Sequence, residues 1–306
     1  MRVLSGTVRN AAVKIETILM YAETVNIQLC ETMKTLYVSD LDGTLLNSNS
    51  RLSEYTVKTL NELINNGMCF SYATARSITS AAIVTQGLIT NMPVITFNGI
   101  FIVNPNTGEK LSSHYFTGNQ NNIIMDAIEK FSMFPLVYSY INGEEKVSWI
   151  TGKENVGIRN YLDSRKGDKR LRPVSTREEL YRGEPFTFIC IGLRKELIDV
   201  YHYFNSLNEF SCYFQPELYR EEYWLEIMPK NATKGNAIVE LRDMLKCERI
   251  ISFGDAINDI SMFQASDECY AVENAVQELK EIATRLIGSN DSNGVAEWLK
   301  MNIIKT

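Results

Sequence analysis

The chain has 306 residues, of which 45% are hydrophobic and 22% charged, and its formal net charge is −6 with an isoelectric point of about 5.2. This length accommodates one large or two ordinary globular domains. The acidic balance disfavours a nucleic-acid-binding surface, which is usually basic. Small anionic substrates stay possible, because a bound metal or a lysine can reverse the sign of a local site. No apolar run is long enough to predict a membrane-spanning helix.

The cysteines and histidines form no recognisable metal or disulfide framework. The 6 cysteines are scattered and include no C-x-x-C pair, so we expect reduced thiols in a cytoplasmic protein. His114 and His202 lie far apart in the chain, which disfavours a zinc site. A Ser-His triad is also disfavoured, because the sequence has no G-x-S-x-G motif.

Residues 1–33 precede the first predicted strand and have no assigned role. Their longest apolar run, 18–22, is short and flanked by acids, so we do not expect a targeting segment. We interpret the segment as an N-terminal extension, either an additional helix outside the core or the product of an alternative start.

The most informative stretch is Tyr37–Leu46, in which a short apolar run ends in a carboxylate. Buried parallel strands have this pattern, and ligand sites lie beyond their carboxyl ends, so Asp40 is expected at the mouth of a sheet. Asp42 follows in a loop where Gly43 allows a sharp turn. Two acids this close repel each other in a dry pocket unless a cation is bound, and Mg²⁺ favours carboxylates with phosphate oxygens. An ordinary turn is the alternative for this stretch alone.

The segment Asp40-Leu41-Asp42-Gly43-Thr44-Leu45-Leu46 resembles the first motif of the haloacid dehalogenase superfamily in its phosphatase form. The resemblance implies that Asp40 attacks phosphorus and that Asp42 is the general acid and base. Dehalogenases of the superfamily lack the second Asp, so Asp42 favours phosphate chemistry over halide chemistry.

Polar residues follow the next two predicted strands as well. A helix capped by Ser53 leads to a strand over 68–73, which ends at Thr74. A hydroxyl beside the N–H groups of a helix start is a phosphate cradle, although Thr74 could merely end the strand. The family's second motif has Thr or Ser here, commonly in A-T-G-R, and Ala75 replaces the glycine. The strand over 93–97 leads to Asn98-Gly99, which also matches the Cof-type branch, although a turn dipeptide is the alternative; a hairpin over 100–103 and 110–116 follows.

Residues 117–218 differ in character and resemble the α/β cap that this branch inserts between its second and third motifs. We predict helices near 123–128 and 197–207, strands over 134–141, 146–150, 187–193, 212–214 and 223–227, and a solvated charged stretch over 165–172. The cap contains no guiding motif. Candidates for substrate contact, by composition alone, are Tyr138, Tyr140, Trp149, Arg220 and Trp224.

Two further motifs follow the cap. The sequence E-I-x-P-K-x-x-x-K-G-x-A over 226–237 matches the family's third motif, with Lys234 favoured over Lys230. A lysine in the first turn of a helix opposes the helix dipole, and a bound phosphate would supply a reason for it. The fourth motif, G-D-x-x-N-D-x-x-M over 254–262, places Asp255 at a strand end and Asp259 one turn later, in a site suited to Mg²⁺ rather than zinc. A capped helix start with solvated acids is the alternative. Helices over 276–286 and 295–304 complete the chain.

The strand–helix alternation predicts an α/β fold, with a doubly wound, Rossmann-like parallel sheet formed by 34–116 and 219–306 and the cap inserted between them. The resemblance implies Mg²⁺-dependent hydrolysis of a phosphomonoester through an aspartyl phosphate. It further implies that Mg²⁺ is held by Asp40, Asp255 and the backbone carbonyl of Asp42, and that Thr74 and Lys234 bind the transferring oxygens. Supporting or phosphate-binding residues would be Thr44, Ala75, Asn98, Asn258 and Asp259.

The implied substrate is a small phosphorylated metabolite, such as a sugar phosphate, pyridoxal phosphate or flavin mononucleotide, with no nucleic-acid or membrane partner. A phosphotransferase or mutase would use the same residues with an acceptor hydroxyl in place of water. A phosphate-binding regulator is disfavoured, because receiver domains are much shorter and their acidic pair is adjacent. Monomer and homodimer both stay open.

Overall fold

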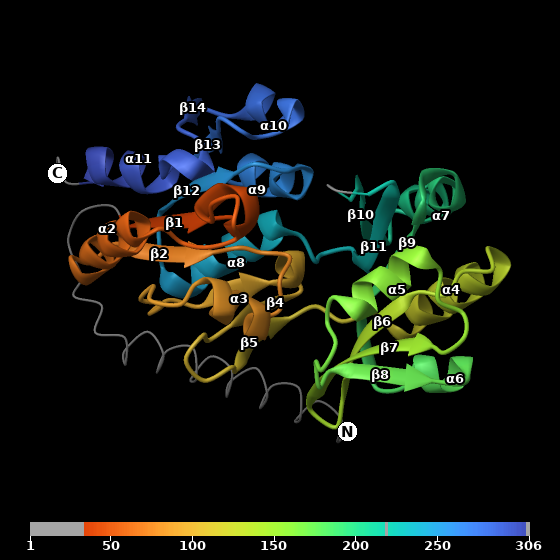
Figure 1. Ribbon diagram of the computed structural model, residues 1–306. Coiled ribbons are helices and arrows are strands. Elements are labelled where there is room, and N and C mark those ends of the chain that lie inside the picture. Colours follow the sequence, from red (N-terminus) through yellow and green to blue (C-terminus); the bar gives the residue numbers. More distant parts are fainter. Residues whose placement is uncertain (1–33, 218–219, 304–306) are drawn as a thin grey trace, which may run out of the picture. The chain divides into compact units, whose positions relative to one another are not determined.

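The structure is a computed structural model that describes residues 34–217 and 220–303 (Figure 1). The predicted N-terminal extension, 1–33, lies outside the described residues. The chain divides into two compact units, one formed by the segments up to Ser113 and from Thr233 onward, the other by His114–Ala232. We call them the core unit and the inserted unit and describe each separately.

The core unit contains a five-stranded parallel sheet in the order β14-β13-β12-β1-β2. Its strands are β1 (Thr35–Ser39), β2 (Cys69–Tyr72), β12 (Arg249–Gly254), β13 (Glu268–Val272) and β14 (Arg285–Ile287). β1 lies between β12 and β2, and its Leu36 and Val38 side chains are fully buried. The predicted parallel α/β core is confirmed.

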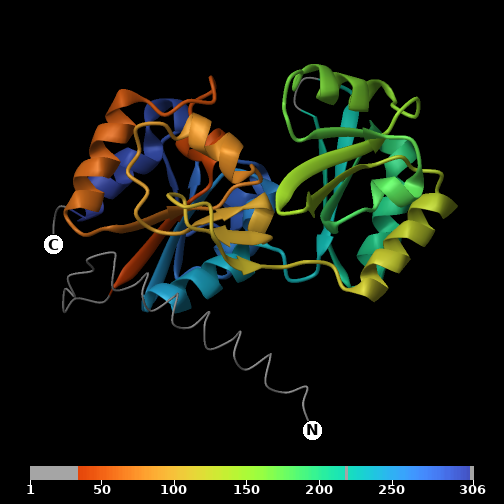
Figure 2. The ribbon, with the colours of Figure 1, turned by 90° about the horizontal axis from the view of Figure 1, so that it is seen from below.

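Helices cover both faces of this sheet (Figures 1 and 2). They are α2 (Glu54–Asn65), α3 (Ile78–Val84), α8 (Lys234–Leu245), α9 (Ile260–Gln264), α10 (Gln277–Ile282) and α11 (Gly294–Ile303). The chain runs from β1 to β2 in one direction along the sheet and from β12 through β13 to β14 in the other. The order therefore reverses between β1 and β12, and ligands of open α/β sheets bind at such a switch point.

Local signals in the sequence account for the helix starts. The Ser53 side chain accepts a hydrogen bond from the Thr56 N–H at the start of α2, and Thr233 caps α8 in the same way through Asn236. The last helix before the C-terminal one is shorter than expected. α10 ends at Ile282, because Arg285–Ile287 forms β14 and pairs with β13 instead of continuing the helix.

A small antiparallel sheet with the order β3-β4-β5 adjoins the parallel sheet. Its strands are β3 (Val94–Thr96), β4 (Phe101–Val103) and β5 (Lys110–Ser113), so the expected hairpin is present. A single parallel bridge between Ala73 and Ile95 links β3 to the end of β2. This link places the residues after β3 beside those after β2.

The inserted unit contains a six-stranded sheet in the order β10-β11-β9-β6-β7-β8. Its strands are β6 (Leu136–Ile141), β7 (Glu144–Ile150), β8 (Leu171–Val174), β9 (Glu184–Leu193), β10 (Phe210–Pro216) and β11 (Glu222–Pro229). Its helices are α4 (Gly118–Lys130), α5 (Val156–Asp163), α6 (Arg177–Leu180) and α7 (Arg194–Ser206). Buried Ile124, Phe188 and Leu225 belong to its own hydrophobic cluster.

Two features of the inserted unit differ from the sequence interpretation. The unit extends from His114 to Ala232 rather than over 117–218, because β11 pairs with both β9 and β10. The charged stretch over 165–172 is not simply solvated. Arg170 forms ion pairs with Asp168 and Glu145, both at 2.7 Å, and β8 then pairs in parallel with β7.

Five cysteines lie among the described residues, and all five are free thiols. In the part of the chain that the structure describes, no helix is both long and apolar enough to cross a bilayer.

Candidate active site

Three carboxylates meet at the carboxyl ends of β1 and β12. Asp40 follows β1 directly, Asp255 follows β12, and Asp259 comes one turn later. One carboxylate oxygen from each side chain lies within 4.8 Å of those of the other two. Because β1 and β12 are neighbouring parallel strands, their ends bring these residues together although more than two hundred positions separate them in the sequence.

Gly43 makes the close approach of the turn Leu41–Leu45 to Asp255 possible. Its φ of 75° lies in the left-handed region that side chains disfavour. A Cβ atom on Gly43 would lie 2.3 Å from Asp255 Oδ2. Thr44, the next residue in the turn, donates its hydroxyl to Asp255 Oδ1 at 2.7 Å. The turn thus depends on Gly43 for space and on Thr44 for its contact with Asp255.

Lys234 lies between two of the three carboxylates. Its side chain is fully buried, and its Nζ donates to Asp40 Oδ1 at 2.6 Å and to Asp259 Oδ1 at 2.7 Å. From the sequence, a bound phosphate was the reason suggested for a lysine in the first turn of this helix. In the structure the partners of this lysine are two carboxylates, and Lys230 is exposed. Asp259 is fully buried rather than solvated, and its Oδ2 accepts from the N–H groups of Asp255 and Ala256, each at 3.0 Å.

The electrostatics of the cluster follow from burial. Burial raises the pKa of Asp40 well above its ordinary range, although the Lys234 ammonium acts in the opposite direction. Burial, together with the charge of Asp259, raises the pKa of Asp255 to about 7. Burial alone would lower the pKa of Lys234, but attraction by Asp259 and Asp40 outweighs it and the net shift is upward.

The donor set fits a hard divalent cation. Three carboxyl groups supply only oxygen ligands, and a single ammonium group leaves part of their charge uncompensated when all are ionised. Oxygen ligands of this kind suit Mg²⁺ or Ca²⁺ and not a metal that needs thiolate or imidazole. Asp40 and Asp255 could hold such an ion, since Lys234 occupies one oxygen of Asp259 and backbone N–H groups occupy the other.

Asp42 lies apart from the three-carboxylate cluster. Its side chain is 48% exposed and forms a bidentate pair with Arg76, with Nε–Oδ2 at 2.7 Å and Nη2–Oδ1 at 2.6 Å. The sequence analysis assigned no role to Arg76. The Arg76 Nη1 also donates to the Ser80 hydroxyl at 3.2 Å, so the guanidinium is held on α3.

Thr74 lies fully buried at the end of β2, and its Oγ1 accepts from the Arg76 N–H at 3.1 Å. Ala75 is exposed. Ser77 caps α3 by accepting from the Ser80 N–H at 3.2 Å. This strand end therefore offers a ligand the buried Thr74 hydroxyl and the exposed residue Ala75.

Asn98 and Asn258 meet each other. The Asn258 Nδ2 donates to the Asn98 Oδ1 at 3.0 Å, and Asn98 is only 2% exposed. The motif residues after β3 and after β12 are thus in direct contact.

Two asparagines that sequence reasoning missed fix the turn after β1. The Asn274 Nδ2 donates to the Gly43 carbonyl at 2.7 Å, and the Asn290 Nδ2 donates to the Leu46 carbonyl at 3.0 Å. The Asn290 N–H donates in turn to the Asn274 Oδ1 at 3.1 Å. Asn274 follows β13, so the signal of a polar residue just past a buried parallel strand was available in the sequence.

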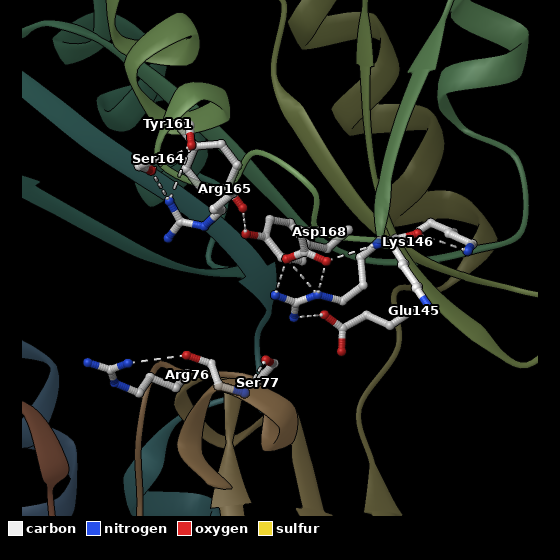
Figure 3. A network of polar contacts seen from close by, with 12 residues as sticks. Arg76, Ser77, Glu145, Lys146, Tyr161, Ser164, Arg165 and Asp168 are labelled. Atoms are coloured by element: carbon white, nitrogen blue, oxygen red, sulfur yellow. Dashed lines mark hydrogen bonds and ion pairs between the residues drawn. The ribbon is translucent and has the colours of Figure 1, made fainter. Parts of the chain in front are cut away.

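The inserted unit carries a polar cluster of its own (Figure 3). The buried hydroxyls of Tyr138 and Tyr161 share a hydrogen bond, and the Arg165 guanidinium lies 3.8 Å from the centre of the Tyr161 ring. Burial raises the pKa of both tyrosines, so they stay protonated. Trp224 packs beside Tyr161, with 5.8 Å between ring centres. The other residues proposed for substrate contact lie in different surroundings. Tyr140 is partly buried, Trp149 donates a hydrogen bond to Glu154, and Arg220 is exposed.

Comparison with known proteins agrees with this geometry. A family model described as haloacid dehalogenase-like hydrolase matches residues 37–299. Two Bacillus subtilis 5-amino-6-(5-phospho-D-ribitylamino)uracil phosphatases are each 25% identical to this chain. Their alignments cover 88% and 85% of this chain and 98% and 95% of the relatives. A solved haloacid dehalogenase-like hydrolase from B. subtilis has a TM-score of 0.71 at 21% identity, covering 88% of this chain and 100% of that chain. At that identity the structural likeness concerns the fold.

Proposed function

This chain belongs to the haloacid dehalogenase-like hydrolases, and on that basis we propose that it is a phosphatase that hydrolyses small phosphomonoesters with the help of Mg²⁺. The observation that carries the proposal is the arrangement of Asp40 beside Asp255, with Lys234 buried between Asp40 and Asp259. A nucleophilic carboxylate, a second acid on a neighbouring strand and a buried cation are the parts that phosphoryl transfer requires.

The reaction proceeds through two displacements. A carboxylate oxygen of Asp40 attacks phosphorus, the bond from phosphorus to the ester oxygen breaks, and Asp42 gives the leaving oxygen a proton. Water then attacks the aspartyl phosphate while Asp42 takes one of its protons. The bond between phosphorus and Asp40 breaks, which releases inorganic phosphate and restores both acids.

The other residues stabilise charge and position the reacting groups. Lys234 and Thr74 bind oxygens of the transferring phosphoryl group, and Asp259 holds Lys234 in place. Asp40, Asp255 and the Asp42 carbonyl would hold Mg²⁺, which would neutralise charge between the carboxylate and the phosphate. The Arg76 guanidinium occupies both oxygens of Asp42, so one of the two hydrogen bonds must open before Asp42 can act as an acid on the ester oxygen, while the other keeps the carboxyl oriented.

The substrate class is a small phosphorylated metabolite. Two relatives named for 5-amino-6-(5-phospho-D-ribitylamino)uracil support a substrate that joins a phosphorylated polyol to a ring, and sugar phosphates and phosphorylated cofactors belong on the same panel. We assign the choice among them to the inserted unit, whose exposed Arg165 and partly buried Trp224 carry charge and ring surface. A cytoplasmic location stays a prediction.

The test is phosphate release from a panel of phosphomonoesters, with Mg²⁺ and with a chelator. Asp40→Asn keeps the size of the side chain but removes the nucleophile, so turnover should fall by at least about a hundredfold. Asp126→Asn, at an exposed position on α4, is the control and should leave turnover unchanged. Retention of more than a few per cent of activity in Asp40→Asn would overturn the assignment of the nucleophile.

Product analysis separates hydrolysis from the alternative of phosphotransfer. A phosphotransferase or mutase would pass the phosphoryl group to an acceptor hydroxyl, so phosphorylated acceptor would accumulate in place of inorganic phosphate. A phosphate-binding regulator would bind Mg²⁺ and phosphate without turning over any ester.

A further inference from the structure

Three successive residues after β3 have a left-handed backbone. The φ angles are 49° at Phe97, 55° at Asn98 and 103° at Gly99. Such a conformation is uncommon for any residue except glycine, and for an aromatic residue it is an outlier. Backbone strain of this kind persists where the surroundings fix the chain, and it gathers at functional sites.

The loop Phe97–Gly99 contacts three separate segments of the proposed active site. Its first two N–H groups donate to the carbonyls of Arg76 and Thr74, at 3.1 and 2.9 Å, so it is bound to the end of β2. At Gly99 the backbone approaches Thr233 so closely that a Cβ would lie 2.2 Å from the Thr233 carbonyl oxygen. Thr233 immediately precedes Lys234.

The third contact is made by a side chain. The Asn98 Oδ1 accepts from the Asn258 Nδ2, and Asn258 lies in the turn between Asp255 and Asp259. Because Asn98 offers a carbonyl oxygen, the amide nitrogen of Asn258 must face it. This contact prevents rotation about the terminal bond of the Asn258 side chain, so its carbonyl oxygen and its second N–H are held in one orientation.

A second Asn-Gly pair in this chain shows what a simple turn looks like. Asn142 and Gly143 join β6 to β7 and have φ angles of 52° and 81°. Both are exposed, as expected of a two-residue hairpin turn. Asn98 has a similar φ of 55° but is buried and bonded to Asn258, so the requirement for a turn does not account for its side chain.

We propose that Asn98 is a positioning residue, which fixes the amide of Asn258 so that Asn258 can hold the phosphoryl group or the attacking water. The proposal rests on the phosphatase function proposed above. It gives the strained loop a role, since the left-handed backbone places the Asn98 side chain against Asn258 while the loop N–H groups stay bound to the end of β2.

The experiment is a double-mutant cycle with a backbone-matched variant. Asn98→Gly keeps the left-handed conformation and deletes the side-chain carbonyl, so kcat should fall by roughly tenfold, the loss expected for one partly buried hydrogen bond. Asn98→Asp keeps an acceptor and tolerates the same backbone, so it should restore most of kcat while raising KM for an anionic ester. Asn142→Gly makes the same chemical change in the exposed turn and should leave kcat and the melting temperature unchanged.

The cycle with Asn258→Ala decides whether Asn98 acts through Asn258. If it does, the double variant should be no slower than Asn258→Ala alone, because the second substitution removes nothing further. The proposal would be overturned if the double variant lost kcat by the product of the two single losses. It would also be overturned if Asn98→Gly kept the wild-type kcat. A crystal structure of Asn98→Gly gives a readout that does not depend on turnover. Asn258 should lose its single orientation there, and an unchanged Asn258 would overturn the proposal even for a protein that cleaves no ester.

Discussion

The pair formed by Arg76 and Asp42 determines how the proposed acid is held before it meets a substrate. The guanidinium binds both carboxylate oxygens, and its own position is fixed by Ser80. A side chain that is 48% exposed would otherwise sample several rotamers. Arg76 therefore orients Asp42, and its removal should matter most for the step in which Asp42 gives up a proton.

Arg76→Ala should slow the hydrolysis of esters with poor leaving groups more than the hydrolysis of esters with good ones. An alkyl phosphate needs its leaving oxygen protonated, whereas p-nitrophenyl phosphate needs little acid assistance. We expect kcat/KM to fall by roughly a hundredfold for the alkyl ester and by less than about tenfold for the aryl ester. Steady-state kinetics on both esters measure this, with Arg182→Ala, at an exposed position of the inserted unit, as the control for loss of a positive charge. An equal loss on both esters would mean that Arg76 does not act through Asp42.

The position of Asp40 and Asp255 followed from the sequence, but the partner of Asp42 did not. Both acids come directly after buried apolar runs, and the ends of neighbouring parallel strands must meet. The contact between Asp42 and Arg76 depends instead on side-chain rotamers and on how far the turn Leu41–Leu45 reaches toward α3. Neither quantity leaves a periodic signal in the chain.

At the scale of elements, side chains from distant segments hold the turn Leu41–Leu45. Asn274 binds the Gly43 carbonyl, Asn290 binds the Leu46 carbonyl just past the turn, and Thr44 binds Asp255. At Gly43 the turn lies so near Asp255 that no Cβ fits between them.

Comparing Gly43→Ala with Gly108→Ala separates the stability lost through a strained backbone from the stability lost through a steric clash with Asp255. Gly108 has the same φ of 75°, but a Cβ there would meet nothing within 4 Å. Gly108→Ala should therefore lose about 1 kcal/mol of unfolding free energy through the left-handed backbone and keep its activity. Gly43→Ala should lose more stability and most of its turnover, because its Cβ displaces Asp255. Urea denaturation and kcat measure both, and indistinguishable variants would show that the contact with Asp255 is unimportant.

The boundaries of helices and strands were predictable where hydrophobic periodicity and capping residues agree. They were less predictable where pairing with a distant strand determines the element. Ser53 caps α2 as expected, and α8 begins with Lys234 in its first turn, also as expected. β11 was expected to close the inserted segment, yet the predicted boundary at 218 placed it in the core. Its membership depends on pairing with β9, which is non-local. β14 was read as the end of a helix for the same reason, since only its pairing with β13 makes it a strand.

At the scale of the whole molecule, the buried carboxylates make stability depend on both pH and metal. In the metal-free protein the pKa of Asp255 is raised to about 7, above the value of 3.8 expected for an unfolded chain. The folded state therefore holds this proton more tightly than the unfolded state. The resulting stability is present at low pH and is lost as the pH rises through about 7. A divalent cation binds the deprotonated form and should recover that loss.

We expect Mg²⁺ to raise the melting temperature more at about pH 8 than at about pH 5.5, because protons compete with the metal at the lower pH. Thermal denaturation with and without Mg²⁺ measures the difference. Asp255→Asn removes the titrating group, so it should abolish most of the metal effect and stabilise the metal-free protein at the higher pH. A metal effect of equal size at both pH values would contradict a role for these carboxyl groups in binding the ion.

The strand order has a consequence for the nascent chain. β1, which Asp40 follows directly, leaves the ribosome early, but its neighbour β12 begins only at Arg249, after the whole inserted unit has been synthesised. Throughout that interval one edge of β1 has no partner in the native order, and an unpaired apolar edge invites association with other chains. The inserted unit, which pairs only with itself in its own sheet, can fold first. Synthesis thus completes the half of the protein assigned to substrate choice before the half that carries out the reaction.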